Sequence, residues 1–197
     1  SNLSSKDPNN IDNEYNCKDE DLIDKIRDTE FQTYELNVNR ITSDSKNIDQ
    51  IIADYQGRYL WELFQNADDS LGKKKNQEPN FIGTKGVGFK SVFEITNEPE
   101  IYSGKFNFKF SSIETQKKLQ NILDKKGIKK QAPYSPSRIP HHIYPSKNKI
   151  IKKLFELKFS TIINLPFKNE TAKNKIINFL ENFDYKFLLF SQNIQSI

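Results

Sequence analysis

The clearest periodic pattern of the chain lies in residues 49–70, DQIIADYQGRYLWELFQNADDS. Its apolar residues recur at the i, i+3, i+4 and i+7 spacing of an amphipathic helix that docks on a core. These residues are Leu60, Leu63, Phe64 and Ala67. At about 100° per residue, Glu62, Asn66 and Asp69 fall within an arc of about 60° nearly opposite that stripe. The pattern predicts one helix with an apolar side and an acidic and amide side.

The remaining segments predict a mixture of helices and strands. Residues 21–52 indicate short helices broken near SDSKN, and residues 1–20 are a polar, Asn-rich stretch typical of a flexible leader. Alternation of Phe with polar residues predicts strand structure over 100–110, bent at Ser103 and Gly104, with one face buried. Helical periodicity returns at 112–126 and 169–183, a buried strand is expected over 157–167, and the four prolines of 131–146 indicate mostly loop. The tail from Tyr185 ends in a further apolar run.

Length and charge limit the classes of function. The 197 residues suit one domain after the leader, 21–197, and the net charge of +4 comes from dispersed lysines, so nucleic acid is not expected as a partner. The single cysteine, Cys17, excludes an internal disulfide. No run approaches the roughly 20 apolar residues of a membrane span. These observations favour a cytoplasmic protein, with the nucleus as the alternative, and no membrane partner.

A glycine-rich segment, IGTKGVGFKSVF, follows at residues 82–93. Its spacing G-x-x-G-x-G differs from the dinucleotide fingerprint, and Phe89 stands where a P-loop needs its lysine, so both motifs are rejected. Glycines permit close backbone approach, and residues 87–93 can begin a helix whose free N–H groups attract an anion. Spacing alone leaves open whether the segment holds an anion or only makes a tight turn.

Polar residues elsewhere are weaker candidates. His141 and His142 lie in the proline-rich stretch without a nearby carboxylate or cysteine in the sequence, so we interpret them as loop residues and not as a metal site.

Taken together, ELFQNADDS and IGTKGVGFKS resemble the N-box and second glycine box of the GHKL ATPases, the superfamily of gyrase, histidine kinases, MutL and the ninety-kilodalton heat-shock chaperone. The segments QNADDS, GTKGVGFKSVF and STIINLPFK look most like the ATP-binding domains of the sacsin and no-vein type. The resemblance covers roughly residues 55–110 and 159–197. It implies an α+β fold, a two-layer sandwich of the Bergerat type, in which helices cover one face of a mixed, mainly antiparallel sheet.

The resemblance also implies roles for individual residues. Glu62 would be the catalytic base that orients and deprotonates water, and Asn66 would bind Mg²⁺ between the phosphates of ATP. Thr161 would help to hold adenine. The nucleotide-binding residues implied in this way are Asn66, Asp69, Gly83, Thr84, Lys85, Gly86, Val87, Gly88, Phe89, Lys90 and Thr161.

One part of the family pattern is absent. The family carries a strand, an adenine-reading Asp box and a lid between the two motifs, whereas here eleven residues separate Ser70 from Ile82 and no Asp occurs between Asp69 and Asp124. The lid and adenine-box region is therefore lacking near residues 71–82. Either the domain is a pseudo-ATPase or a stretch is omitted from the sequence, and we favour omission.

The expected function is Mg²⁺-dependent binding and slow hydrolysis of ATP that drives conformational change in a larger chaperone-like protein. The alternative is a non-hydrolysing pseudo-ATPase that serves as an interaction scaffold. Expected partners are ATP or ADP, protein clients or other domains of the same chain, and a second copy in a dimer.

Overall fold

The computed structural model describes residues 17–72, 87–104, 106–133, 139–184 and 186. The chain forms two compact units. The sheet unit comprises Ser1–Ser45 and Asn97–Pro166, and the helical unit comprises Lys46–Thr96 and Phe167–Ile197.

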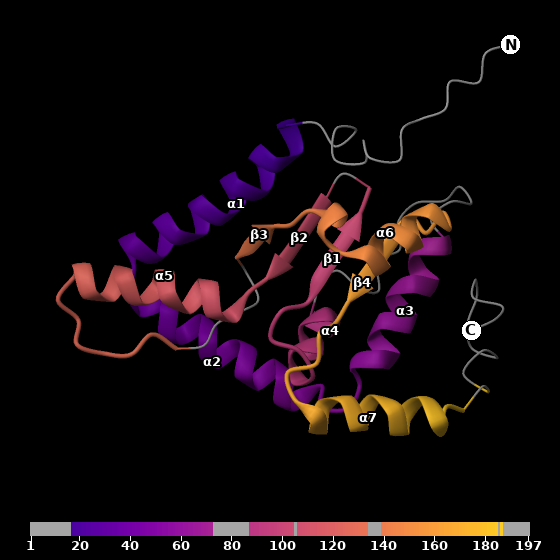
Figure 1. Ribbon diagram of the computed structural model, residues 1–197. Helices are drawn as coiled ribbons and strands as arrows, with labels where there is room; N and C mark the ends of the chain where they lie inside the picture. The colour runs from indigo at the N-terminus through magenta and orange to yellow at the C-terminus, as the bar shows by residue number, and fades with distance from the viewer. Residues whose placement is uncertain (1–16, 73–86, 105, 134–138, 185, 187–197) are drawn as a thin grey trace, which may run out of the picture. The chain divides into compact units, whose positions relative to one another are not determined.

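The sheet unit is built on a four-stranded antiparallel sheet in the order β3-β2-β1-β4. Its strands are β1 (Glu100–Ser103), β2 (Phe106–Phe110), β3 (Pro140–His142) and β4 (Thr161–Asn164). Gly104, at φ 56, makes the turn from β1 to β2, since a positive φ is open to glycine without steric cost. Figure 1 shows the four strands of this sheet. Ile101 pairs with Phe108 on one side and Ile163 on the other, which fixes the register across the middle of the sheet.

Helices cover one face of this sheet. Tyr102 and Ile162 point to the same face because they are paired across β1 and β4, and both pack on Ile151 of α6 (Lys149–Glu156). His141 projects from that face by strand alternation and contacts α5 (Ser112–Lys125). The unit therefore has two layers, which confirms the predicted α+β class.

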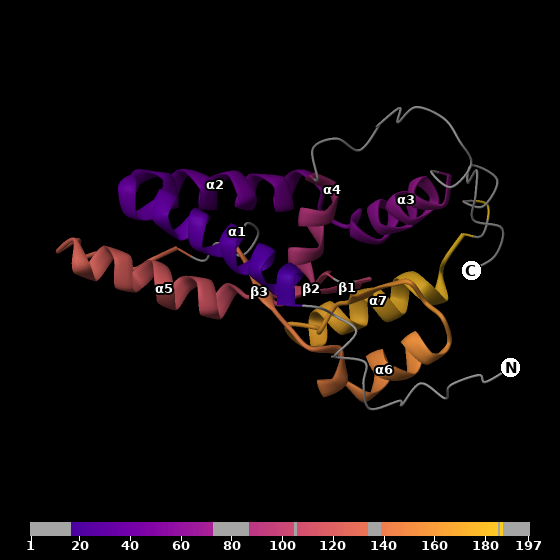
Figure 2. The same cartoon turned by 90° about the horizontal axis from the view of Figure 1, so that it is seen from above.

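A second core cluster lies between α1 (Cys17–Leu36) and α5, which pack side by side in both views (Figures 1 and 2). Its buried members are Phe31, Tyr34, Ile41, Leu119, Ile122, Leu123, Ala132 and Ile139. Ser111 caps α5 by accepting a hydrogen bond from the N–H of Glu114. The short 3-10 turn η2 (Pro145–Lys147) leads from β3 into α6.

The buried face of β2 is the polar one. Asn107 is only 2% exposed, whereas Phe106 is 43% exposed and Phe108 and Phe110 are half-buried. Alternation over 106–110 therefore predicts the strand correctly. The side of β2 nearest the covering helices nevertheless carries Asn107 and Lys109, and Lys109 pairs there with Glu114 of α5.

The helical unit contains α3 (Tyr59–Gly72), α4 (Val87–Lys90), η1 (Ser91–Glu94) and α7 (Glu170–Glu181), together with the C-terminal part of α2 (Asn39–Asp54). Val92, Phe93 and Ile95 are buried within it. Lys168 N–H donates to the carbonyl of Ile95 at 2.9 Å, beside an antiparallel bridge from Thr96 to Phe167. Trp61, Phe64, Phe179 and Phe183 form an aromatic cluster between α3 and the C-terminal end of α7.

Two predicted boundaries are wrong. The helix expected over 49–70 is interrupted between α2 and α3, where Gly57 has φ 74 and its N–H donates to Glu94 Oε2 at 2.7 Å. The break expected at SDSKN lies inside α2 instead, and the chain leaves helix α1 near Asn37. The hydrogen bond from Gly57 to Glu94 therefore accompanies a break in the helix that the local apolar period did not indicate.

Other expectations hold in part. The helices at 112–126 and 169–183 are confirmed as α5 and α7, and the side chain of Asn169 caps α7 by accepting from Ala172 N–H. The strand expected over 157–167 exists as β4, but it is an edge strand of the described sheet and buries only Ile162. Of the predicted leader, residues 17–20 belong to α1, and 1–16 lies outside the described residues.

Candidate functional site

The candidate site is centred on helix α3, which carries Glu62, Asn66 and Asp69 as predicted. Glu62 and Asn66 are four residues apart and therefore share one side of the helix. Another side of α3 packs on the rest of the helical unit. It carries Trp61 and Phe64, whose ring centroids lie 5.4 and 5.5 Å from that of Phe183.

The apolar stripe of α3 differs from the prediction. Leu60, Leu63 and Phe64 are half-buried, Ala67 is exposed, and Asp68 is buried at 9% exposure. Trp61 and Asp68 therefore lie on the packed side, which the i, i+3, i+4 count of aliphatic residues did not reveal. The signal was the position of Trp61, since a tryptophan in a helix of a small unit usually finds a core to pack on.

Glu62 lies directly against Gly88 of α4. A Cβ at position 88 would come within 2.9 Å of the Glu62 carboxyl carbon and would clash with Oε2. Only a glycine leaves the carboxylate this space. The structure thus brings together one residue from each of the two sequence motifs, which lie 26 positions apart in the chain.

The Glu62 side chain is 17% exposed, and its Oε1 lies 3.5 Å from Nη2 of Arg58, one helical turn earlier. Arg58 itself is mostly exposed and also lies over the ring of Tyr55. Because the guanidinium is solvated and the contact is long, this pair adds little to stability. The carboxylate is therefore largely sheltered from solvent, and Arg58 holds it only loosely.

The segment after Gly88 is helical, as predicted for residues 87–93, with one turn of α4 continuing into η1. The Ser91 hydroxyl donates to the carbonyl of Gly88 at 2.6 Å, and Ser91, Val92 and Phe93 are buried. Phe89 and Lys90 are half-buried. This buried turn fixes the backbone of Gly88 against α3.

Several predicted residues are not placed together with this pair. Gly83, Thr84, Lys85 and Gly86 lie outside the described residues, and Asp69 and Val87 are located only as positions in α3 and α4. Asn66 is exposed.

Thr161 belongs to the sheet unit. It is the first residue of β4, it is exposed, and its Oγ1 lies 2.8 Å from Oγ of Ser103 on β1.

The described residues near Glu62 suit a cation that takes most of its ligands from water and a bound phosphate, and not a metal site built entirely from protein side chains. In the part of the chain that the structure describes, no group of three or more His, Cys, Asp or Glu residues could hold a metal ion. Mg²⁺ commonly takes one or two protein oxygens and completes its shell with water and phosphate. The amide of Asn66 fits that pattern.

Glu94, which the sequence did not single out, joins three parts of the helical unit. Besides the Gly57 N–H, it accepts a hydrogen bond from Lys175 Nζ of α7 at 2.8 Å, and its side chain is 10% exposed. The hydrogen bond to Glu94 raises the pKa of Lys175, and burial together with the Glu94 charge raises the pKa of Tyr59. A cavity of about 420 Å³ beside these groups is also lined by Phe179 and Asn182.

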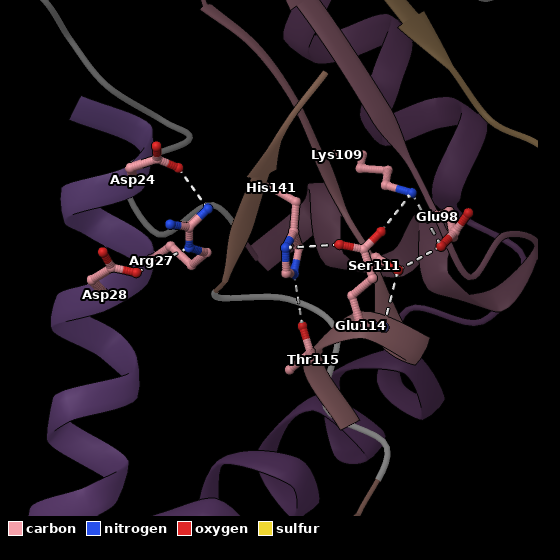
Figure 3. A network of polar contacts seen from close by, with 9 residues as sticks. All are labelled: Asp24, Arg27, Asp28, Glu98, Lys109, Ser111, Glu114, Thr115 and His141. Atoms are coloured by element: carbon pink, nitrogen blue, oxygen red, sulfur yellow. Dashed lines mark hydrogen bonds and ion pairs between the residues drawn. The ribbon is translucent and has the colours of Figure 1, made fainter. Parts of the chain in front are cut away.

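The sheet unit contains a separate polar network around His141 (Figure 3). Nδ1 of His141 lies 3.2 Å from Glu114 Oε2, and Nε2 lies 3.3 Å from Thr115 Oγ1. Lys109 Nζ lies 3.1 Å from Glu114 Oε1 and 3.5 Å from Glu98 Oε1. The interpretation of His141 as a loop residue without a carboxylate partner is therefore wrong: it lies in β3, and folding brings Glu114 to it from α5.

The charges around His141 set its protonation. Burial lowers the pKa of His141; Glu114 opposes this, while Lys118, Arg27 and Lys109 reinforce it. Burial alone would raise the pKa of Glu114, but the hydrogen bond from Lys109 and the surrounding positive charges lower it. Although hydroxyl, imidazole and carboxylate are arranged as in a nucleophilic triad, Thr115 is 0% exposed, so no substrate reaches it. The network is structural.

Comparisons with known proteins give one relationship. The chain is 31% identical over 131 residues to the Protein NO VEIN of Arabidopsis thaliana, which covers 62% of this chain and 4% of that protein. The chain thus spans a small fraction of the length of the curated relative that it matches. No protein-family model matches the chain, and no solved structure matches it. No helix in the described ranges has the length and apolar character needed to cross a membrane.

Proposed function

We propose that this chain binds ATP with Mg²⁺ and hydrolyses it slowly, as a nucleotide-binding domain of a larger chaperone-like protein. The observation that supports the proposal best is the contact of the Glu62 carboxylate with Gly88, which joins the two motifs that resemble the GHKL boxes. The similarity to Protein NO VEIN is consistent with the no-vein type of that resemblance.

In the proposed reaction Glu62 holds the attacking water through a carboxylate oxygen and accepts its proton. General base catalysis of this kind contributes roughly 10² to 10⁴ in rate. Arg58 is 3.5 Å from Oε1 of Glu62, which is too far for a strong hydrogen bond, so a carboxylate oxygen of Glu62 can accept that proton. Gly88 keeps the position free of a side chain.

Asn66 would supply the protein oxygen for Mg²⁺. When bound, the ion neutralises the charge that develops on the phosphate oxygens. The same side of α3 then carries both the base and the metal ligand, one turn apart. Thr161 and the glycines at 83 and 86 enter the proposal only through the family resemblance.

A non-hydrolysing scaffold is the second candidate. The observation that favours it is the lack of any Asp between Asp69 and Asp124, where the resembled family places its adenine-reading residue. A scaffold would keep the contact between Glu62 and Gly88 as helix packing.

Isothermal calorimetry with ATP and Mg²⁺, combined with a phosphate-release assay, tests the proposal. We expect Glu62→Ala to retain ATP binding and to lose turnover by at least about 10²-fold, and Asn66→Ala to lose Mg²⁺-dependent binding. Gln65→Ala, an exposed change on the same helix, is the matched control and should alter neither. The proposal fails if the chain shows neither heat of binding nor turnover.

A further inference from the structure

Helix α6 of the sheet unit is anchored along one side. Ile151 packs in the small core with Tyr102 and Ile162, and Leu154 and Phe155 flank it. The Asn148 side chain accepts hydrogen bonds from the N–H groups of Ile150 and Ile151, at 3.0 and 3.3 Å. The helix is short, but its start and its buried side are both fixed.

The end of α6 is also fixed. Lys158 N–H donates to Phe155 O at 2.8 Å and Phe159 N–H donates to Leu154 O at 3.2 Å, the two bonds of a Schellman motif. Lys158 occupies its left-handed position at φ 69, where glycine is usual. Position 158 therefore carries a charged side chain although its backbone conformation favours glycine.

Large apolar side chains are exposed at the border of the buried side of α6, since Ile150 and Leu157 lie about 100° to 120° from Ile151 around the helix. Ile150 is 71% exposed, Leu157 61% and Phe159 53%. Ile150 and Leu157 are seven residues apart and therefore lie on the same side of the helix. At about 100° per residue, Lys149 and Lys153 fall within roughly 100° of both.

The charged residues around α6 are mostly basic. Four lysines, Lys149, Lys152, Lys153 and Lys158, stand against one acidic residue, Glu156. Among the residues that the structure describes, none of these four amines forms an ion pair with a carboxylate. Lys152 is half-buried and lies about 160° from Ile150 around the helix, so it belongs to another side. We call the other three lysines with Ile150, Leu157 and Phe159 the α6 basic surface.

An acidic protein, a single-stranded nucleic acid and an anionic lipid surface each require different side chains for binding. Protein interfaces are depleted in lysine and rely on aromatic and arginine anchors. Single-stranded nucleic acid needs aromatic side chains for base stacking, whereas two of the three apolar groups here are aliphatic. An anionic lipid surface accepts aliphatic side chains at the boundary of headgroups and acyl chains, while lysines reach phosphates without a fixed geometry. The last description fits the α6 basic surface best.

We infer that the α6 basic surface binds anionic lipid membranes reversibly, with Ile150, Leu157 and Phe159 entering the interface and the lysines contacting headgroups. The expectation of no membrane partner rested on the lack of a spanning segment, and peripheral contact does not need one. This inference is independent of the proposed nucleotide chemistry.

Sedimentation of the 197-residue chain with vesicles tests it. We expect binding to phosphatidylcholine vesicles that contain phosphatidylserine, and none to phosphatidylcholine alone. Binding should weaken strongly between about 0.1 M and 1 M salt, where the Debye length falls from about 10 Å to 3 Å. Lys149→Glu/Lys153→Glu should reduce binding at least about ten-fold. Ile150→Asn/Leu157→Asn should reduce it at least about five-fold with all lysines present.

The matched control is Lys129→Glu/Lys130→Glu, which makes the same charge change at two exposed lysines away from α6 and should leave most binding intact. Thermal unfolding of each variant verifies that the fold survives. The inference is overturned if wild-type chain ignores anionic vesicles at low salt, or if the control loses as much binding as Lys149→Glu/Lys153→Glu. It is also overturned if the chain ignores vesicles but binds polyglutamate through Lys149 and Lys153, because the partner would then be an acidic protein.

Discussion

The carboxylate of Glu62 occupies the space that any side chain at position 88 would need. Two motifs separated in the chain therefore depend on each other, because a glycine in α4 is required for the position of an acid in α3. This dependence can be measured whether or not nucleotide binds.

Gly88→Ala should displace the Glu62 carboxylate. The added methyl group meets the mobile end of a side chain, so we expect the fold to survive while any ATP turnover falls about 10²-fold, as for loss of a general base. Phosphate release by the variant and the wild type measures this directly.

A double-mutant cycle on stability isolates the contact. In the Glu62→Ala background the obstructing carboxylate is gone, so Gly88→Ala should be more favourable there than in the wild type by about 1 kcal/mol. Urea unfolding of the four chains gives the coupling. Additive effects would show that the two residues do not contact each other.

The His141 network should make the sheet unit sensitive to mild acid. Because burial lowers the pKa of His141, the unfolded chain takes up this proton at a higher pH than the folded chain does. The stability from neutral His141 is complete above the unfolded pKa of about 6.5 and declines as the pH falls below it. Unfolding free energies at successive pH values should follow that course.

Two variants separate titration from packing at this site. His141→Asn removes the proton uptake, so its stability should decline less than that of the wild type between neutral and mildly acidic pH. Thr115→Val removes one contact of the imidazole and keeps the titration, so its loss of stability should not remove the pH dependence. Identical pH slopes for His141→Asn and the wild type would contradict the assignment.

The aromatic cluster should hold α3 to α7. Trp61 lies 5.2 Å from Phe179 and 5.4 Å from Phe183 between ring centroids. Trp61→Ala should destabilise the chain by about 3 kcal/mol, the lower end for loss of a large aromatic because the ring is only half-buried. Ile177→Ala, at an exposed position of α7, should cost less than 1 kcal/mol by the same measurement, roughly as for surface substitutions.

The left-handed residue at the end of α6 predicts a stabilising change. Lys158→Gly should be more stable than Lys158→Ala by about 1 kcal/mol, since both remove the lysine and only glycine relieves the positive φ. Thermal unfolding of the pair measures the difference. Equal stabilities would mean that position 158 is not held in the left-handed region.

Local patterns predicted the elements whose signals are local. Asn169 caps α7, and such a cap is a local signal because its side chain needs only the N–H three residues later. The helix at 112–126 and the alternating strand at 106–110 were recognised for the same reason: helical and strand periods show within a few residues. Helix α6 was missed although Asn148 and the apolar period at Ile150, Ile151 and Leu154 carried the same kind of signal.

Long-range partners account for most of the errors. Gly57 interrupts the predicted helix because its N–H finds Glu94, 37 residues later. His141 looked isolated until α5 brought Glu114 to it, and Asn107 is buried because helices cover its side of the sheet. Within the candidate site, the helical position of Glu62 followed from the sequence, whereas its contact with Gly88 depends on how α4 packs on α3.

Glu94 has a mechanical consequence for the helical unit. One carboxylate receives the main-chain N–H of Gly57, just before α3, and the ammonium of Lys175 in the middle of α7. Glu94 is also the last residue of η1, which continues directly from the turn of α4 that carries Gly88. A rotation of α3 about its first residues would therefore act on α7 through Glu94 as well as through the aromatic cluster, so that a small displacement beside Glu62 would also move α7.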